Sequence, residues 1–476
     1  MGIYTKPLKR TWRLNSGERK IILFVGDVIV SVLALMIALY FWAQSPQEWL
    51  NFSWQFLGER IPGWYYLLPV IWMLLLVELY DVDRSSNRLE TFKGIAIAAV
   101  IAVILYLIVY FTSEPNSLPR RGVASFILGA FLLTLGWRML YIAIFTAPRF
   151  MRRVIIVGAG RAGTTLLQVI KSTWPPPFYL VGLVDDDPEK MGAEFLDYRV
   201  LGSSADLMAL IKEHQISDLI FAISGEMRPE TFRVLLEAEE HGVQVTTMPA
   251  VYEQLLGRVP IFLLQSDWIL RSFLDQAHLS GFYEVGKRLI DLLGGFIGLL
   301  IFVIATPFIA LLILVDNGRP VFYSQERVGL NGRVFTILKF RTMRSTPVKP
   351  GEKAAPTVEN DARITRLGKI LRKSHVDELP QFINILRGEM SLVGPRSEQP
   401  AIVQELQEQI PFYRARLLVK PGLTGWAQVN YGYASNAAQN AIKVEYDLYY
   451  IKRRNLLLDV LILFRTFGAV FGLRGQ

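Results

Sequence analysis

The sequence RVIIVGAGRAGTTLLQVI, residues 153–170, decides the fold of the middle of the chain. Its apolar run Val154–Val157 has the length and the β-branched composition of a buried strand. A glycine-rich turn and a predicted helix over 164–170 follow, and the glycines are Gly158, Gly160 and Gly163. A strand, a glycine turn and a helix in this order are typical of a doubly wound parallel sheet.

Outward from this stretch, further short strand-like runs occur at 179–184, 219–223 and 243–247, separated by segments of helical length. Residues 151–256 are therefore predicted to form a Rossmann-like α/β domain. Asp185 directly follows the second strand, where a ribose-binding acid is expected in dinucleotide-binding folds. Two interpretations of the glycine turn stay open. It could cradle a phosphate, or its glycines could serve only the close packing of strand and helix.

The N-terminal residues 1–150 carry four apolar runs, at about 21–42, 64–79, 95–111 and 123–145. Their lengths predict a membrane α-helical bundle of four spans. Basic residues gather in the tail before the first run and around Arg149–Arg153 after the last, which predicts a cytoplasmic location for both. Arg138 lies inside the fourth run and should face another helix or a partner chain, because a cation is costly against lipid.

The composition supports a membrane protein and excludes several chemistries. Hydrophobic residues make up 52% of the chain, yet 20% are charged, so the two kinds must be segregated. The net charge of +9 is attributed to cytoplasmic loops and anionic headgroups, so no nucleic acid partner is expected. The absence of cysteine excludes disulfides, zinc–thiolate sites and cysteine nucleophiles.

Residues 257–280 show no clear period and are predicted to connect the α/β domain to a third domain, 281–476. That domain opens with an apolar run bounded by Lys287 and Arg288 and interrupted by Pro307. Because basic residues lie at both ends and Pro307 removes a helical hydrogen bond, 287–315 is predicted to be a re-entrant membrane helix. An ordinary fifth span is the alternative.

Tyr283 and Lys287 match the YxxxK spacing of short-chain dehydrogenases and nucleotide-sugar dehydratases. Gly286 weakens the helix that such a pair would need, and the apolar run begins directly afterwards. We therefore interpret Lys287 as an anchor at the membrane edge.

The chemistry is predicted to lie further on, where a dense basic segment leads into the adjacent carboxylates Asp377 and Glu378. One interpretation is a helix N-terminal acid pair neutralised by arginines. The other is a carboxylate nucleophile that attacks phosphorus beside a second acid, with Mg²⁺. Basic side chains and rigid turns around the pair suit the recognition of a diphosphate. The candidate substrate-binding residues are Lys339, Arg341, Arg372, Gln381, Arg396 and Gln428.

Several motifs in order and in spacing closely resemble the bacterial sugar transferase family, the polyprenyl-phosphate glycosyl-1-phosphate transferases. They are 287–315, 325–329, 339–343, 377–381, 390–396, 420–428 and 446–450. The preceding spans and α/β domain resemble the long membrane form of the family, and the C-terminal stretch is most similar to its exopolysaccharide branch. Ser397 departs from the usual Pro-Arg-Pro turn, which leaves the arginine in place but relaxes the turn.

The resemblance implies a third, α/β monotopic catalytic domain in which Asp377 is the nucleophile and Mg²⁺ ligand, Glu378 is its partner and Arg396 binds phosphate. Lys287, Arg288 and Pro307 would belong to the re-entrant helix. The implied reaction transfers a hexose-1-phosphate from a UDP-sugar to undecaprenyl phosphate and releases UMP. It would be the first membrane step of exopolysaccharide, capsule or O-antigen synthesis, at the cytoplasmic face of the bacterial inner membrane.

Two alternatives belong to other classes of protein. A membrane-bound nucleotide-sugar dehydratase or epimerase would need a second complete glycine-rich fold after residue 280, and the sequence shows none. A non-enzymatic assembly protein that senses nucleotide would not need the intact acid pair. The middle domain is also a candidate surface for a homodimer.

Overall fold

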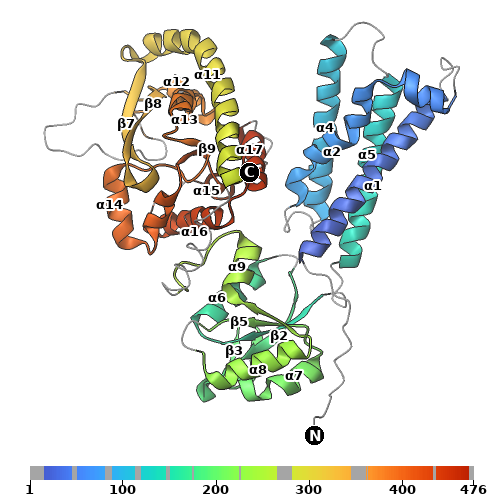
Figure 1. Ribbon diagram of the computed structural model, residues 1–476, viewed down its shortest axis with the longest axis vertical. Coiled ribbons are helices and arrows are strands. Elements are labelled where there is room, and N and C mark those ends of the chain that lie inside the picture. Colours follow the sequence, from blue (N-terminus) through green and yellow to red (C-terminus); the bar gives the residue numbers. More distant parts are fainter. Residues whose placement is uncertain are drawn as a thin grey trace. The chain divides into compact units, whose positions relative to one another are not determined.

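The computed structural model describes residues 16–44, 51–80, 88–112, 120–145, 151–173, 176–223, 227–264, 281–344, 361, 363–432 and 436–470 (Figure 1). The chain divides into two compact units at Met248 and Pro249. The first unit holds the N-terminal helices and the α/β sheet, and the second holds the acid pair.

Three long apolar helices dominate the N-terminal part: α1 (Ser16–Ala43), α4 (Arg88–Thr112) and α5 (Arg120–Phe145). Each is long and apolar enough to cross a membrane, and α11 of the second unit is the fourth such helix among the described residues. The second predicted span is built differently. It consists of the 3-10 helix η2 (Gly63–Leu67), α2 (Leu68–Leu75) and the 3-10 helix η3 (Val77–Tyr80), preceded by the π-helical turn η1 (Phe56–Arg60). Pro69 at the start of α2 explains one break, because proline suits only the first turn of a helix.

Arg138 faces another helix, as predicted. Its guanidinium forms two hydrogen bonds to Asp27 of α1, one of them 2.7 Å long, and both side chains are fully buried. Arg138 also donates to the carbonyl of Leu79, and Tyr80 donates to Asp27. The buried charges are therefore paired and hydrogen-bonded inside the helix bundle, as an apolar surrounding requires.

The α/β part of the first unit is a six-stranded sheet of order β3-β4-β2-β1-β5-β6. Five strands are parallel and the two-residue edge strand β3 is antiparallel. The parallel sheet predicted from 153–170 is confirmed. The strands are β1 (Arg153–Val157), β2 (Tyr179–Val184), β3 (Glu194–Phe195), β4 (Tyr198–Gly202), β5 (Asp218–Phe221) and β6 (Gln244–Thr247). The helices are α6 (Arg161–Ser172), η5 (Pro188–Lys190), η6 (Ser204–Asp206), α7 (Leu207–His214) and α8 (Pro229–Glu240).

The second unit is mostly helical, with two small sheets. An antiparallel hairpin joins β7 (Phe322–Val328) to β8 (Val334–Phe340) through η7 (Leu330–Gly332), and β9 (Ser391–Val393) pairs in parallel with β10 (Gly422–Thr424). The helices are α9 (Met248–Leu256), α11 (Gly281–Asn317), α12 (Arg366–Lys373), η8 (Val376–Gln381), α13 (Phe382–Arg387), α14 (Pro400–Gln409), η9 (Tyr413–Leu418), α15 (Trp426–Asn430), α16 (Ala437–Arg453) and α17 (Leu456–Val470). The described residues after 281 form no larger parallel sheet, so the second glycine-rich fold that a dehydratase would need is absent from them.

Part of the predicted connector belongs to the core of the second unit. Val259 and Ile261 are buried and pack in the same cluster as residues of β9, α14 and α16. Trp426 donates its indole N–H to the carbonyl of Gly257 at 2.7 Å. A segment without a regular hydrophobic period can still be buried, because individual apolar side chains can pack into the core of a neighbouring part of the unit. The rest of the predicted connector, 265–280, lies outside the described residues.

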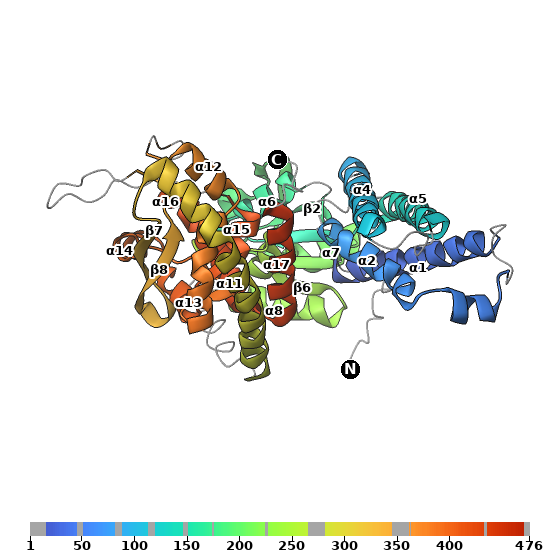
Figure 2. The ribbon, with the colours of Figure 1, turned by 90° about the horizontal axis from the view of Figure 1, so that it is seen from above.

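Helix α11 is 37 residues long and contains Pro307. Figure 1 shows that it bends sharply between its first and last parts. Pro307 cannot donate to the preceding turn, and the Thr306 hydroxyl donates to the carbonyl of Phe302 at 2.6 Å, a contact that bends helices. The first part of α11 lies beside α17 (Figure 2). The bend suits a re-entrant helix, which remains a prediction.

Candidate active site

Asp377 and Glu378 lie in the 3-10 helix η8, which directly follows α12. His375 between the two helices has a left-handed backbone with φ of 56° and turns the chain out of α12. Both acids are buried, each with 8% of its surface exposed. Carboxylates buried to this degree need compensating charges.

Glu378 receives that compensation from two cations. Its Oε1 lies 2.6 Å from Nζ of Lys339 on β8 and 2.8 Å from Nη2 of Arg396, which follows β9. Burial alone would raise the pKa of Glu378, but the charges and hydrogen bonds of Arg396 and Lys339 outweigh it and hold that pKa well below its usual range. Glu378 is therefore an ionised carboxylate that fixes both cations.

Asp377 is in the opposite condition. Its carboxylate has no hydrogen-bond partner among the described residues, and burial followed by the adjacent charge of Glu378 raises its pKa. The charges of Lys339, Arg372 and His375 act against this shift. A desolvated carboxylate that no hydrogen bond occupies is the more nucleophilic member of such a pair.

The other predicted substrate-binding residues are distributed around this pair. Arg372 donates to the hydroxyl of Thr342 at 2.9 Å while its charge acts on Asp377. Gln381, at the end of η8, is buried, and its amide nitrogen has no partner among the described residues. Arg341 donates to the backbone carbonyl of Arg319 at 2.7 Å. Gln428 donates to the carbonyl of Leu423. The structure thus joins Lys339 and Arg396 to Glu378 and brings the charge of Arg372 to act on Asp377, while Arg341 and Gln428 donate to backbone carbonyls.

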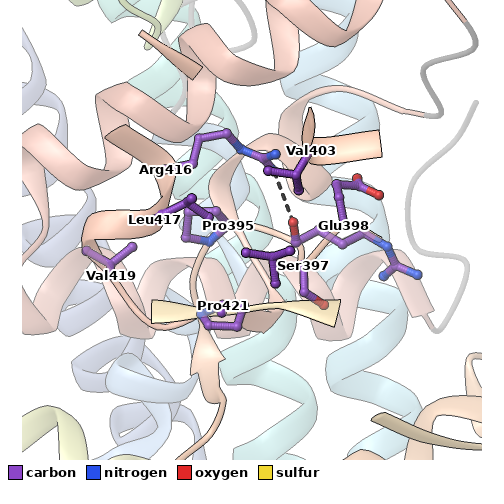
Figure 3. Close-up of a pocket in the computed structure, with 11 residues that line it drawn as sticks. Pro395, Ser397, Glu398, Val403, Arg416, Leu417, Val419 and Pro421 are labelled. Carbon is purple, nitrogen blue, oxygen red and sulfur yellow. Dashed lines mark hydrogen bonds between the residues drawn. The ribbon is translucent and has the colours of Figure 1, made fainter. Parts of the chain in front are cut away.

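The turn that carries Arg396 is held from several sides. The amide of Gly394 donates to Thr424, and the amide of Gly422 donates to Pro395, each at 2.9 Å. Arg416 donates to the carbonyl of Arg396 at 3.0 Å, the dashed line of Figure 3. This turn therefore keeps a defined place although Ser397 replaces the second proline.

A small pocket borders this turn. Its walls include the apolar side chains of Val403, Val419 and Pro421, and Glu398 and Arg416 supply charge (Figure 3). Both charges are already paired: Arg416 lies 2.7 Å from Asp447 of α16, and Glu398 lies 3.5 Å from Arg327 of β7. These partners, distant in sequence, were missed by sequence reasoning, which has no local signal for them.

Lys287 and Arg288 donate hydrogen bonds within the second unit, and a place for Lys287 at the membrane edge remains a prediction. The Lys287 ammonium donates to Val393 of β9, to Tyr450 of α16 and to Asp459 of α17, at 3.0 to 3.1 Å. Arg288 donates to the carbonyls of Ile385 and Leu386 at the end of α13. The sequence does not predict these contacts, because the partners lie 97 to 172 residues away.

In the α/β sheet, the glycine turn is closely packed. Gly158 has φ of +112°, and a side chain at Gly163 would overlap the carbonyl oxygen of Gly158. Asp185 accepts the amide protons of Ala159 at 2.6 Å and of Asp187 at 3.0 Å. Close packing accounts for Gly158 and Gly163, while Gly160 faces open space at the start of α6. Nucleotide binding there remains a prediction.

Mg²⁺ was also predicted. No three histidine or carboxylate side chains gather as a ligand set within the described ranges. Mg²⁺ often takes only one or two protein carboxylates and completes its shell with water and substrate phosphates. The carboxylate of Asp377, which no hydrogen bond occupies, fits that role together with a diphosphate.

Comparisons with known proteins identify the family of the chain. A family model described as bacterial sugar transferase matches residues 282–473. A UDP-N-acetylgalactosamine-undecaprenyl-phosphate N-acetylgalactosaminephosphotransferase from Aeromonas hydrophila is 37% identical over 302 residues, which cover 63% of this chain and 69% of that protein. The chain belongs to the bacterial sugar transferase family. It is thus an enzyme of the phosphoglycosyl transferase class, as the sequence predicted.

Other relatives in this family differ in the sugar that their names give. An undecaprenyl-phosphate glucose phosphotransferase from Komagataeibacter xylinus is 32% identical over 67% of this chain, which spans 59% of that relative's length. A UDP-galactose-lipid carrier transferase from Erwinia amylovora is also 32% identical, and the matched region covers 67% of this chain and 68% of that relative's length. A second model, described as a CoA-binding domain, matches residues 76–249, which include α4, α5 and the parallel sheet.

Proposed function

We propose that this sugar transferase moves a hexose-1-phosphate from a UDP-sugar to undecaprenyl phosphate and releases UMP. The observation that carries the proposal is the division of labour within the acid pair. Glu378 is ionised and occupied by Lys339 and Arg396, whereas Asp377 is buried without a hydrogen-bond partner among the described residues. One acid thus holds the cations that a diphosphate needs, and the other is available to react.

In the first step, a carboxylate oxygen of Asp377 attacks the phosphorus that bears the sugar. The bond between this phosphorus and the bridging oxygen breaks, and its electron pair leaves on UMP. An acyl phosphate between Asp377 and the sugar phosphate remains. Lys339, Arg372 and Arg396 would lower the repulsion between an anionic nucleophile and an anionic substrate. Mg²⁺ bound by Asp377 and the diphosphate would neutralise further negative charge.

In the second step, a phosphate oxygen of undecaprenyl phosphate attacks the same phosphorus. The bond to Asp377 breaks and regenerates the carboxylate, and the lipid leaves with a diphosphate-linked sugar. Two separate displacements suit a site beside a membrane, because the soluble donor and the lipid acceptor need not be bound together. The bend of α11 and the proline within this helix support a helix that enters and leaves one leaflet on the cytoplasmic side of the inner membrane.

The test is transfer of radiolabel from a panel of UDP-sugars by the detergent-purified chain with Mg²⁺ and undecaprenyl phosphate. We expect one sugar to enter the lipid phase with release of UMP; release of UDP would contradict phosphosugar transfer. The panel should include glucose, galactose and N-acetylgalactosamine, the sugars named for the relatives.

The nucleophile is tested by Asp377→Asn, which should reduce UMP release by at least about a thousandfold because the amide cannot attack phosphorus. The acid limb of the wild-type pH–rate profile should lie above the ordinary aspartate pKa of about 4, since burial raises the pKa of Asp377 and only its ionised form reacts. Normal turnover by Asp377→Asn would refute the assignment.

A further inference from the structure

The buried polar network at the start of α11 is not used by the proposed reaction. The Lys287 ammonium uses its three protons on three elements: the Val393 carbonyl of β9, the Tyr450 hydroxyl of α16 and the Asp459 carboxylate of α17. Asp459 is 1% exposed and also accepts the hydroxyl protons of Tyr283 and Tyr450. Every strong donor and acceptor in this cluster is satisfied, as a charge pair in an apolar surrounding must be.

One of these contacts leads directly to the active site. Val393 is the last residue of β9 and precedes Arg396 by three positions. The residues between them are fixed on the opposite side by the hydrogen bonds of Gly394 and Pro395 to β10. A side chain at Gly394 would overlap the backbone carbonyl of Lys420, so the two segments are in close contact. A shift at Val393 is therefore transmitted to Arg396.

The next residue of α11 holds the other half of the site. Arg288 donates to the carbonyls of Ile385 and Leu386 at the end of α13, the helix that continues from η8 and its acids. Asp291, one turn further on, accepts the amide proton of Leu392 at 2.8 Å and the hydroxyl proton of Ser391 at 2.9 Å. Adjacent residues of one helix thus grip the segment that carries Arg396 and the segment that carries Glu378.

We infer that Lys287 is a positioning residue: through its hydrogen bond to the Val393 carbonyl it sets where Arg396 lies relative to Glu378 and Asp377. Asp459 and Tyr450 hold the Lys287 ammonium in place. Displacement of a charged group by about 1 Å can cost two orders of magnitude in rate, so the contact matters for chemistry and not only for folding. The inference rests on the proposed function.

The test must separate position from stability. Lys287→Met alone leaves Asp459 buried without its cation, which destabilises the fold. The double variant Lys287→Met/Asp459→Asn is neutral at both positions, and the amide oxygen can still accept from Tyr450. It removes the Lys287 donor to the Val393 carbonyl without leaving a buried charge, and leaves that carbonyl with the more distant Tyr450 hydroxyl, at 3.3 Å. We expect its thermal midpoint to return close to the wild-type value.

UMP release by the full chain in detergent is measured beside the midpoint. We expect kcat of the double variant to stay about 10- to 100-fold below wild type, with the loss in kcat rather than in KM, because the arginine keeps its charge and loses only its place. Recovery of wild-type kcat together with stability would overturn the inference and leave Lys287 a purely structural residue. Should the double variant fail to fold, Lys287→Arg decides. It keeps a cation beside Asp459, but a planar guanidinium cannot reproduce the three hydrogen bonds of the ammonium, so kcat should fall severalfold. Wild-type kcat in a folded Lys287→Arg variant would then overturn the inference.

A double-mutant cycle with Arg396→Gln adds a second readout. If Lys287 acts through Arg396, replacing Lys287 should lower kcat little further in a protein that already carries Arg396→Gln. Fully additive losses would contradict the route through Arg396. Wild-type protein in the same assay keeps the two proposals apart: no UMP release by wild type refutes the proposed function, whereas an active wild type with an equally active double variant refutes only the role of Lys287.

Discussion

Replacement of Glu445 should change how the second unit responds to pH. Glu445 of α16 is 6% exposed and lies against the segment 249–264, where Tyr252 donates to it at 3.3 Å and Arg258 lies 3.4 Å away. Burial raises its pKa from 4.5 to about 7, although Arg258 and Tyr252 act in the opposite direction. The folded protein therefore retains a proton on Glu445 that the opened segment loses.

The sign and size follow from this difference. Below pH 4.5 Glu445 is protonated in both states, and the packing contributes its full stability. As the pH rises to about 7, ionisation increasingly favours the open state; above that value the loss is complete. A difference of about 2.5 pKa units, at 1.36 kcal/mol each, corresponds to roughly 3 kcal/mol in the free energy of opening.

Hydrogen exchange at the amide of Val259 reports this opening, because that amide donates to the backbone carbonyl of Glu445 at 3.0 Å. After correction for intrinsic exchange, wild-type protection should fall by about two orders of magnitude between pH 4.5 and 7. Glu445→Gln should show protection that does not depend on pH in this range. The same slope in both proteins would refute the reasoning, as would a flat wild-type profile.

Two further changes test other parts of the molecule. Arg138→Leu leaves Asp27 buried without its cation and should lower the free energy of unfolding by about 3–5 kcal/mol, seen as a lower thermal midpoint in detergent. The double variant Arg138→Met/Asp27→Asn should recover most of this stability, and an unchanged midpoint in Arg138→Leu would contradict the pairing. Gly394→Ala places a methyl group against the backbone carbonyl of Lys420 and should lower UMP release by more than about tenfold. Gly281→Ala is the control, because open space surrounds that position and activity should not change. Equal activity of the two variants would contradict the close packing of the turn.

The parts of the fold that sequence predicted well are those with local patterns. The parallel sheet follows from apolar runs bounded by glycine turns, and the structure has strands at every predicted run, at β1, β2, β5 and β6. The acid pair and its arginine were also found in sequence, because charged residues of both signs are concentrated there. What these patterns do not contain is which cation meets which acid.

The features that the sequence did not predict have the same physical origin. The sequence does not predict the contact of Lys287 with Asp459, because Asp459 lies 172 positions later in the chain. The run at 64–79 has the composition of a span, but Pro69 and two 3-10 turns divide its helix, and hydropathy does not register backbone geometry. Arg416 gave no signal in sequence, since only the fold brings Asp447 to it.

The burial of Val259 and Ile261 has a consequence for how such proteins can exchange parts. A hybrid of two relatives that changes parent after residue 264 would take Val259 and Ile261 from one parent. It would take α16, with Glu445 and Lys452, from the other parent, so the two sides of this packing contact would come from different proteins. Lys452 lies 2.6 Å from Glu253, so even the charges on the two sides must match. A hybrid that changes parent at Met248, where the first unit ends, takes both sides of the contact from the same parent. The segment that can be exchanged between relatives as one unit therefore begins at residue 249, well before the first residue of α11.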